Sequence, residues 1–121
     1  MLLKYNLANL NGWVLADSRM GSNLQAIALA EEMGINFSVV NIKYNLLGNL
    51  PNMLLPYGFY HILRPNFYQL IKENTPQIII SASRRTGHIS SSIKKILPEV
   101  KNIHILRPEM EFANFDCVIL P

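Results

Sequence analysis

The feature that most constrains the fold is a succession of short apolar runs that alternate with segments of helical pattern. The first run, 13–16, follows Gly12 and is entirely apolar, which is typical of a strand buried on both faces of a parallel sheet. A helical segment over about 23–33 comes next and ends at Gly34, a residue suited to the positive φ that often closes a helix. A β-branched segment, 35–43, completes a strand–helix–strand unit, which implies a right-handed crossover and a parallel pair of strands.

The alternation resumes after an irregular region, 44–65, which glycine and proline break repeatedly and which holds one short expected helix over 50–55. The elements expected beyond it are helices over 67–74 and 88–97, strands over 78–82, 103–106 and 115–120, and a loop over 83–87. This order predicts an α/β fold with a doubly wound, mostly parallel, Rossmann-like sheet in a single domain over 1–121. Because a covering helix normally follows such a last strand, we expect the domain to be truncated at 121.

Composition limits where such a domain acts. Half of the residues are hydrophobic and 16% are charged, as in a folded globular chain. No apolar run is long enough to span a bilayer, and the first ten residues lack the apolar core and cleavage site of a signal peptide. The single cysteine, Cys117, excludes an internal disulfide and lies in an apolar strand, where we expect a buried, inert thiol. These features predict a cytoplasmic protein.

Charge and histidine spacing exclude several kinds of site. The formal net charge is +3, which mildly favours anionic partners but is too small to indicate nucleic acid. The basic residues also form no stripe interleaved with aromatic residues, as single-stranded nucleic acid would require. The three histidines have no spacing typical of metal ligands, so neither a metal site nor a cofactor is expected.

The first candidate site is the loop after the run 13–16, because ligands of open parallel sheets bind at the carboxyl ends of the strands. A helix begins there, and its N-terminus suits an anion. Asp17 is the candidate catalytic residue, since it could accept hydrogen bonds from sugar hydroxyls or act as a base. The alternative is that Asp17 and Ser22 merely cap a turn and a helix. The candidate ligand- or anion-binding residues of this loop are Ser18, Arg19, Gly21, Ser22, Asn23 and Gln25.

The second candidate site follows the strand predicted over 78–82. Small residues there let a ligand approach the backbone, and two arginines converge on a helix N-terminus, so an anion again fits best. The alternative is that the arginines are solvated or pair with carboxylates such as Glu109 or Glu111. The candidate residues are Ser83, Arg84, Arg85, Thr86 and Gly87.

The segment 44–60 is rich in leucine and aromatic residues for an irregular region. One hypothesis is that it contacts the inner face of a membrane or a lipid-linked acceptor, which would make the protein peripheral to that membrane. The alternative is that it packs over the sheet edge or against a second domain.

Three segments together resemble one protein family. Residues 12–26 are similar to a signature that runs Trp-Val-Leu, an Asp, a Gly and an Asn-x-Gln that enters a helix. Residues 76–86 resemble an apolar strand that ends in small residues and Arg-Arg-Thr, and 115–121 resemble a Phe-Asp-x-Val-Ile-x-Pro strand. The family is the bacterial and plant group of glycosyltransferase-like proteins that includes the plant elongated-mitochondria fission factor. An older label for its bacterial members is predicted nucleotide-sugar epimerase.

The resemblance implies a GT-B-like architecture of two facing Rossmann-type domains, of which this chain is the N-terminal, acceptor-side half. It implies a glycosyltransferase whose partners are a sugar or lipid-linked acceptor and a nucleotide-sugar donor, with the donor site mostly in the other half and no turnover by this half alone. The alternatives are a non-catalytic protein- or membrane-interaction module and a truncated relic. Two departures from the family pattern, Ser18 and Ser83 where glycine is common, place a side chain where backbone alone would lie.

Overall fold

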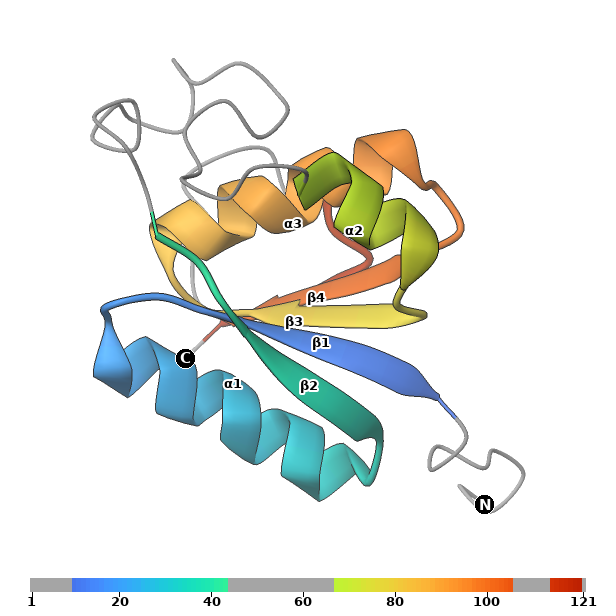
Figure 1. Ribbon diagram of the computed structural model, residues 1–121. Coiled ribbons are helices and arrows are strands. Elements are labelled where there is room, and N and C mark those ends of the chain that lie inside the picture. The colour runs from blue at the N-terminus through green and yellow to red at the C-terminus, as the bar shows by residue number, and fades with distance from the viewer. Residues whose placement is uncertain (1–9, 44–66, 106–113, 121) are drawn as a thin grey trace.

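The apolar runs become parallel strands of one sheet in the computed structural model, which describes residues 10–43, 67–105 and 114–120 (Figure 1). The sheet order is β2-β1-β3-β4-β5, and every neighbouring pair is parallel. The strands are β1 (Asn11–Ala16), β2 (Asn36–Asn41), β3 (Ile78–Ser81), β4 (Lys101–Ile105) and β5 (Cys117–Ile119). The helices are α1 (Met20–Met33), α2 (Phe67–Glu73) and α3 (Arg84–Ile96). The predicted α/β class and doubly wound parallel sheet are confirmed.

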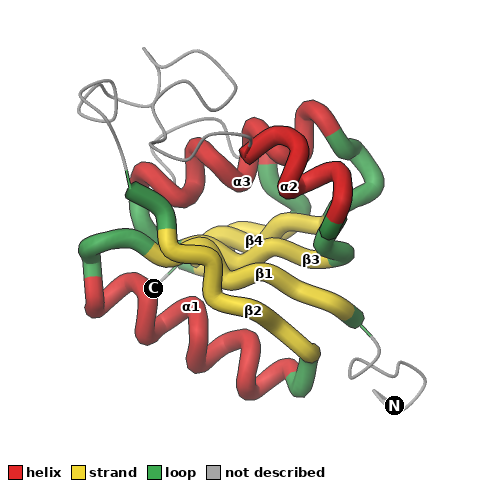
Figure 2. The backbone as a smooth tube through the Cα atoms, viewed as in Figure 1, coloured by secondary structure: helices red, strands yellow, loops and turns green. Residues whose placement is uncertain are grey.

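The winding of the sheet reverses at β1. The chain steps from β1 to β2 in one direction, whereas β3, β4 and β5 follow on the other side of β1. Because crossovers between parallel strands are right-handed, this reversal places α1 on the face opposite to α2 and α3. Figures 1 and 2 show α1 beneath the sheet and α2 and α3 above it. The carboxyl ends of β1 and β3 therefore flank the point where ligands of such sheets bind.

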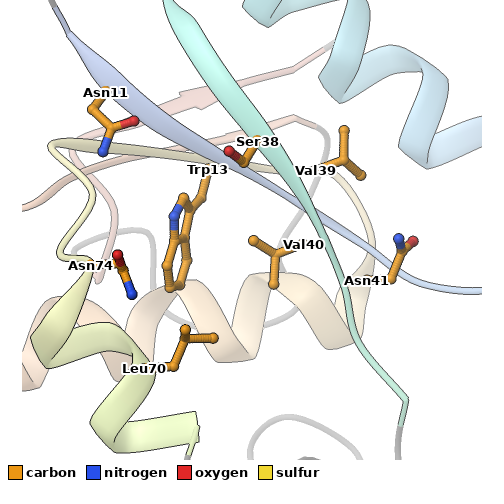
Figure 3. A pocket seen from close by; sticks show the side chains of 8 residues that line it. All are labelled: Asn11, Trp13, Ser38, Val39, Val40, Asn41, Leu70 and Asn74. Carbon is orange, nitrogen blue, oxygen red and sulfur yellow. The ribbon is translucent and has the colours of Figure 1, made fainter.

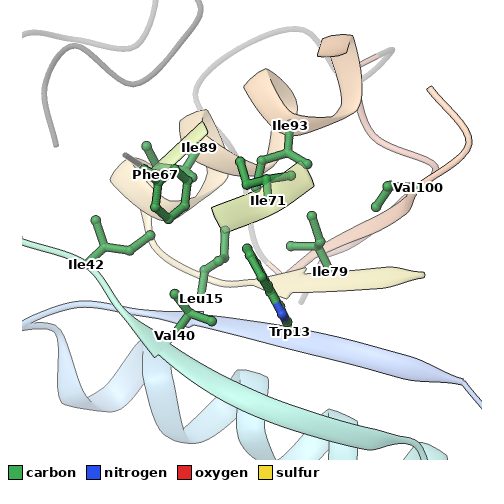
Figure 4. Close-up of a cluster of buried hydrophobic side chains, with 10 residues drawn as sticks. All are labelled: Trp13, Leu15, Val40, Ile42, Phe67, Ile71, Ile79, Ile89, Ile93 and Val100. Atoms are coloured by element: carbon green, nitrogen blue, oxygen red, sulfur yellow. The ribbon is translucent and has the colours of Figure 1, made fainter. Parts of the chain in front are cut away.

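The middle strands are buried on both faces, which explains their unbroken apolar character. In β1, Trp13 and Leu15 point toward α2 and α3, whereas Val14 points toward α1. The larger cluster, between the sheet and the upper helices, is shown in Figure 4 and contains Trp13, Leu15, Val40, Ile42, Phe67, Ile71, Ile79, Ile89, Ile93 and Val100. The cluster under α1 contains Val14, Ala26, Ala30, Ile35, Ile78, Ile80 and Ala82.

The structure corrects several predicted boundaries. The helix predicted over 88–97 begins at Arg84, so most of the predicted loop 83–87 is helical. The helix predicted over 23–33 begins at Met20, and its C-cap is Gly34 with a φ of 73°, as predicted. The strand predicted over 35–43 is shorter, the strand predicted from 103 begins at Lys101, and the last strand covers only Cys117–Ile119. The helix predicted over 50–55, the segment 44–60, and Glu109 and Glu111 lie outside the described residues.

The prediction that Cys117 is buried is wrong. Its thiol is free and exposed, because β5 is the edge strand of the sheet and pairs only with β4 among the described strands. Apolar neighbours in the sequence do not bury a residue when the strand lies at an edge. Within the described ranges no helix is long and apolar enough to cross a bilayer.

Polar contacts of Asp116 hold the edge strand in place. Its carboxylate accepts hydrogen bonds from the backbone N–H of Asn102 at 2.9 Å and from Lys94 Nζ at 3.0 Å. Its own N–H donates to the Asn102 side chain at 2.9 Å. Desolvation acts to raise the pKa of Asp116, but the Asn102 hydrogen bond and the Lys94 contact outweigh it, so the pKa lies below its ordinary value.

Gly87 on α3 provides the first stability prediction. A Cβ at this position would lie 2.7 Å from Cε1 of His104, whose ring is fully buried. We expect Gly87→Ala to lower the free energy of unfolding by roughly 1–3 kcal/mol, because neither the helix nor the ring can move away. Urea denaturation measures the loss.

Gly21→Ala is the matched control, because a Cβ there meets nothing within 4 Å and the residue lies inside α1. This change should raise the stability by up to about 1 kcal/mol through helix propensity. Equal stability of Gly87→Ala and the wild type would contradict the packing of α3 on β4.

Candidate functional site

The two loops singled out in the sequence meet at the carboxyl edge of the sheet. β1 and β3 are adjacent, with Val14 paired with Ile80, so the loops that follow them lie side by side. One loop enters the N-terminus of α1 beneath the sheet and the other enters the N-terminus of α3 above it. Two helix N-termini thus converge on the point where the winding reverses, and each presents backbone N–H groups and partial positive charge there.

A hydrogen bond between side chains joins the loops. Ser83 Oγ donates to Asp17 Oδ2 at 2.8 Å across the strand pair. The other carboxylate oxygen, Oδ1, accepts from the backbone N–H of Arg19 at 2.9 Å, which closes a tight turn. Both oxygens of the Asp17 carboxylate therefore accept hydrogen bonds, which fix its orientation at the carboxyl edge of the sheet.

Asn23 fixes the backbone of Asp17. Its Nδ2 donates to the Asp17 carbonyl at 2.7 Å, and its Oδ1 accepts from the Asp17 N–H at 3.1 Å. The side chain is only 8% exposed. The N-cap position of α1 is Arg19, without a side-chain cap, so the alternative that Ser22 caps the helix is wrong. The structure shows Asn23 as a clamp on the loop.

Ser83 also starts α3. Its Oγ accepts from the Thr86 N–H at 3.1 Å, and Thr86 Oγ1 accepts from the Ser83 N–H at 3.1 Å, which together form a capping box. The signal for this box, a Ser followed three residues later by a polar side chain, is present in the sequence, but the helix was predicted to begin later. Arg84 and Arg85 occupy the first turn of α3 and are half-buried.

The other predicted site residues differ in their solvent exposure. The exposed ones are Ser18, Arg19, Gly21 and Gln25, and Ser22 is half-buried. Ser83, Thr86 and Gly87 are buried beneath them. Ser83, one of the predicted ligand-binding residues, donates its hydroxyl hydrogen to Asp17 and accepts from the Thr86 N–H at the helix cap. Glycine is common at this position in the family pattern, and the serine hydroxyl forms the hydrogen bond that joins the two loops.

Sequence reasoning missed a buried polar pair below the site. Ser81, the last residue of β3, has its Oγ 2.7 Å from Nδ1 of His104 on β4, and both side chains are fully buried. The Phe115 ring lies 5.2 Å from the His104 ring, centroid to centroid. Desolvation by burial lowers the pKa of His104 to about 4, so the ring is neutral at physiological pH. Nothing in the local sequence indicates this pairing, because it joins residues of two different strands.

The described part of the chain holds no group of three or more His, Cys, Asp and Glu residues that could bind a metal ion. The candidate site instead offers one oriented carboxylate, two arginines and two helix N-termini. Such an arrangement can bind an anion through the N–H groups and guanidinium groups, and a hydroxyl through the carboxylate.

The fold and the site define a Rossmann-like, doubly wound α/β domain with its candidate ligand site at the switch point of the sheet. The chain belongs to the mitochondrial fission ELM1 family, whose family model matches residues 20–121. This membership confirms the resemblance seen in the sequence.

A relative from Rickettsia prowazekii (strain Madrid E), the uncharacterized protein RP120, is 38% identical over 112 residues. The match covers 93% of this chain and 32% of the relative, so the chain spans about a third of the length of the curated relative that it matches. No solved structure matches the chain.

Ser83 provides the first prediction for the site. Ser83→Ala removes the helix cap and the contact with Asp17, and we expect it to lower the free energy of unfolding by about 1–2 kcal/mol. A double-mutant cycle with Asp17→Ala, which removes the acceptor, should show a coupling energy of roughly 0.5 kcal/mol or more in urea denaturation, because the two side chains touch. Ser18→Ala, in the exposed loop, is the control and should change little. Strict additivity of the two changes would show that the bond is not formed in solution.

Burial of His104 makes the free energy of unfolding depend on pH. The unfolded chain binds a proton on this histidine below pH 6.5, whereas the folded chain does not until about pH 4. Because the unfolded state binds more protons in that window, stability falls as the pH falls from 6.5 toward 4, with a slope approaching about 1.4 kcal/mol per pH unit.

His104→Asn tests this assignment, since it keeps a polar atom for Ser81 but does not titrate. The variant should show a flatter pH profile of unfolding free energy between 6.5 and 4, whatever its stability at pH 7. An unchanged slope in the variant would assign the pH dependence to other groups.

Proposed function

We propose that the chain forms the acceptor-binding part of a nucleotide-sugar-dependent glycosyltransferase and turns over no substrate alone. The observation that supports this proposal best is the hydrogen bond from Ser83 to Asp17, because it unites an oriented carboxylate and an arginine-bearing helix N-terminus at one point. Glycosyl transfer needs both a group that receives the proton of an acceptor hydroxyl and groups that hold anionic phosphates. Family membership and the sequence signatures are consistent with that chemistry.

In this proposal Asp17 accepts a hydrogen bond from the acceptor hydroxyl and takes its proton as the hydroxyl oxygen bonds to the anomeric carbon of the donor sugar. The bond from that carbon to the phosphate oxygen breaks, and the nucleoside diphosphate leaves. Its orientation is set before any ligand arrives, by the Ser83 hydroxyl, the Arg19 N–H and the Asn23 clamp. Pre-organisation of this kind lowers the entropic cost of reaching the reactive geometry. Arg84, Arg85 and the exposed Arg19 hold the anionic groups of acceptor or donor.

The remainder of the donor site belongs, in the proposal, to a second domain of the family's architecture. The matched relative is about three times as long as the region it shares with this chain, which leaves room for such a domain in that relative. The chain alone should therefore bind ligands weakly and transfer no sugar.

The arginines give the test of this proposal. Arg84→Ala and Arg85→Ala should each weaken the binding of pyrophosphate and of uridine diphosphate by about tenfold, the effect of losing one hydrogen bond to a charged group. Isothermal titration calorimetry measures both ligands. Lys95→Ala, which removes the same charge from the last turns of α3, is the matched control and should retain the wild-type affinity.

Asp17→Asn separates the two roles, since it removes a negative charge beside the bound anion and should leave anion binding equal or tighter. Unchanged affinity in both arginine variants would remove these residues from the site and favour a non-catalytic interaction module.

A further inference from the structure

A groove with no assigned role lies beside the switch-point site. Its volume is about 550 Å³, within the range of small-molecule sites. Figure 3 shows the residues that line it, which come from β1, β2 and the end of α2: Asn11, Trp13, Ser38, Val39, Val40, Asn41, Leu70 and Asn74. None of the predicted site residues belongs to this lining.

The described lining residues are uncharged and form an apolar floor and a polar rim. The floor is apolar and rigid, because Trp13 and Val40 belong to the larger core cluster and Leu70 packs against it. The Trp13 ring is held by Phe67, with ring centroids 6.3 Å apart. The rim on this side of β2 is made of the exposed side chains of Asn11, Ser38 and Asn74 (Figure 3). Two amides and a hydroxyl can each donate and accept hydrogen bonds.

This combination suits a neutral, polyhydroxylated ligand. Sugar hydroxyls also both donate and accept, so amide and hydroxyl side chains can pair with them in either direction. The C–H faces of a sugar ring suit an apolar floor that contains part of an indole. None of the described lining residues carries a charge, so they offer an anion no ion pair.

The groove also reaches the edge that carries Asp17. Asn41, the last residue of β2, pairs with Ala16, the residue before Asp17. The backbone N–H of Ile42, just after β2, donates to the Ala16 carbonyl at 2.8 Å. The opposite end of the groove is marked by Asn11 and Asn74, at the start of β1 and just after α2. The lining therefore runs along β2 from the start of β1 to the edge that carries Asp17.

We propose that this groove binds an uncharged carbohydrate segment of the acceptor, next to the acceptor hydroxyl that donates a hydrogen bond to Asp17. The inference rests on the proposed function and makes it more specific, since it names a saccharide chain as the part of the acceptor that this domain recognises. Binding itself needs only the groove, so it can be measured without turnover.

The intrinsic fluorescence of the chain tests the proposal, because Trp13 is its single tryptophan and lies in the floor. Titration with maltose and with N,N′-diacetylchitobiose should give a saturable change of emission at millimolar concentrations for at least one of the two. Asn74→Ala should weaken that binding by roughly threefold to tenfold, as expected for the loss of one or two neutral hydrogen bonds. Ser38→Tyr should abolish it by filling the groove. Gln69→Ala, on α2 but outside the lining, is the control and should bind as the wild type does.

Thermal unfolding of each variant shows whether it is folded, and a folded Ser38→Tyr variant that still binds sugar would overturn the proposal. No saturable response of the wild-type chain to either sugar would overturn it as well. The Arg84→Ala variant distinguishes the two proposals, because it should bind anions about tenfold more weakly and keep sugar binding. If the arginine variants keep wild-type anion affinity and the wild-type chain binds sugar, the groove proposal is supported. The assignment of the arginines to an anion site is then contradicted.

Discussion

The position of the candidate site depends on the reversal of winding between β1 and its two neighbours. Because β2 lies on one side of β1 and β3 on the other, the helices that follow β1 and β3 approach the same edge from opposite faces. That geometry alone gives two N-termini with unpaired N–H groups around one point. The burial of β1 and β3 on both faces keeps this arrangement rigid, since neither strand can shift without exposing one of the two cores.

Two helix N-termini at one edge of the sheet are common in this fold class. Polar contacts give them a specific arrangement here. Ser83 caps α3 and also reaches Asp17, while Asn23 holds the backbone of the same residue from α1. Below them, the Ser81–His104 pair and Gly87 allow α3 to approach β4 closely. The result is a carboxylate whose direction is fixed by groups from both loops, in a region where helix N-termini supply positive potential.

The sequence predicted the class of fold, the order of the elements and the two loops at the carboxyl edge, because each of these rests on local patterns. Apolar runs mark buried strands, and Gly34 marks the end of a helix in any tertiary setting. It did not predict where α3 begins, because Thr86 is a less familiar partner in a capping box than Glu or Gln. Nor did it predict the exposure of Cys117, which depends on the place of β5 in the sheet. The Asp17–Ser83 bond and the Ser81–His104 pair join residues distant in sequence, and a single sequence carries no local signal for such pairs.

The bond between Asp17 and Ser83 has an evolutionary consequence. Ser83 loses its contact with a carboxylate once Asp17 changes to an apolar residue, and Asp17 loses part of its orientation once Ser83 changes to glycine. Change at either position therefore alters the selective value of the residue at the other. Among family members, the two positions should be inherited as a pair, so that lineages with glycine at position 83 orient their aspartate by other means.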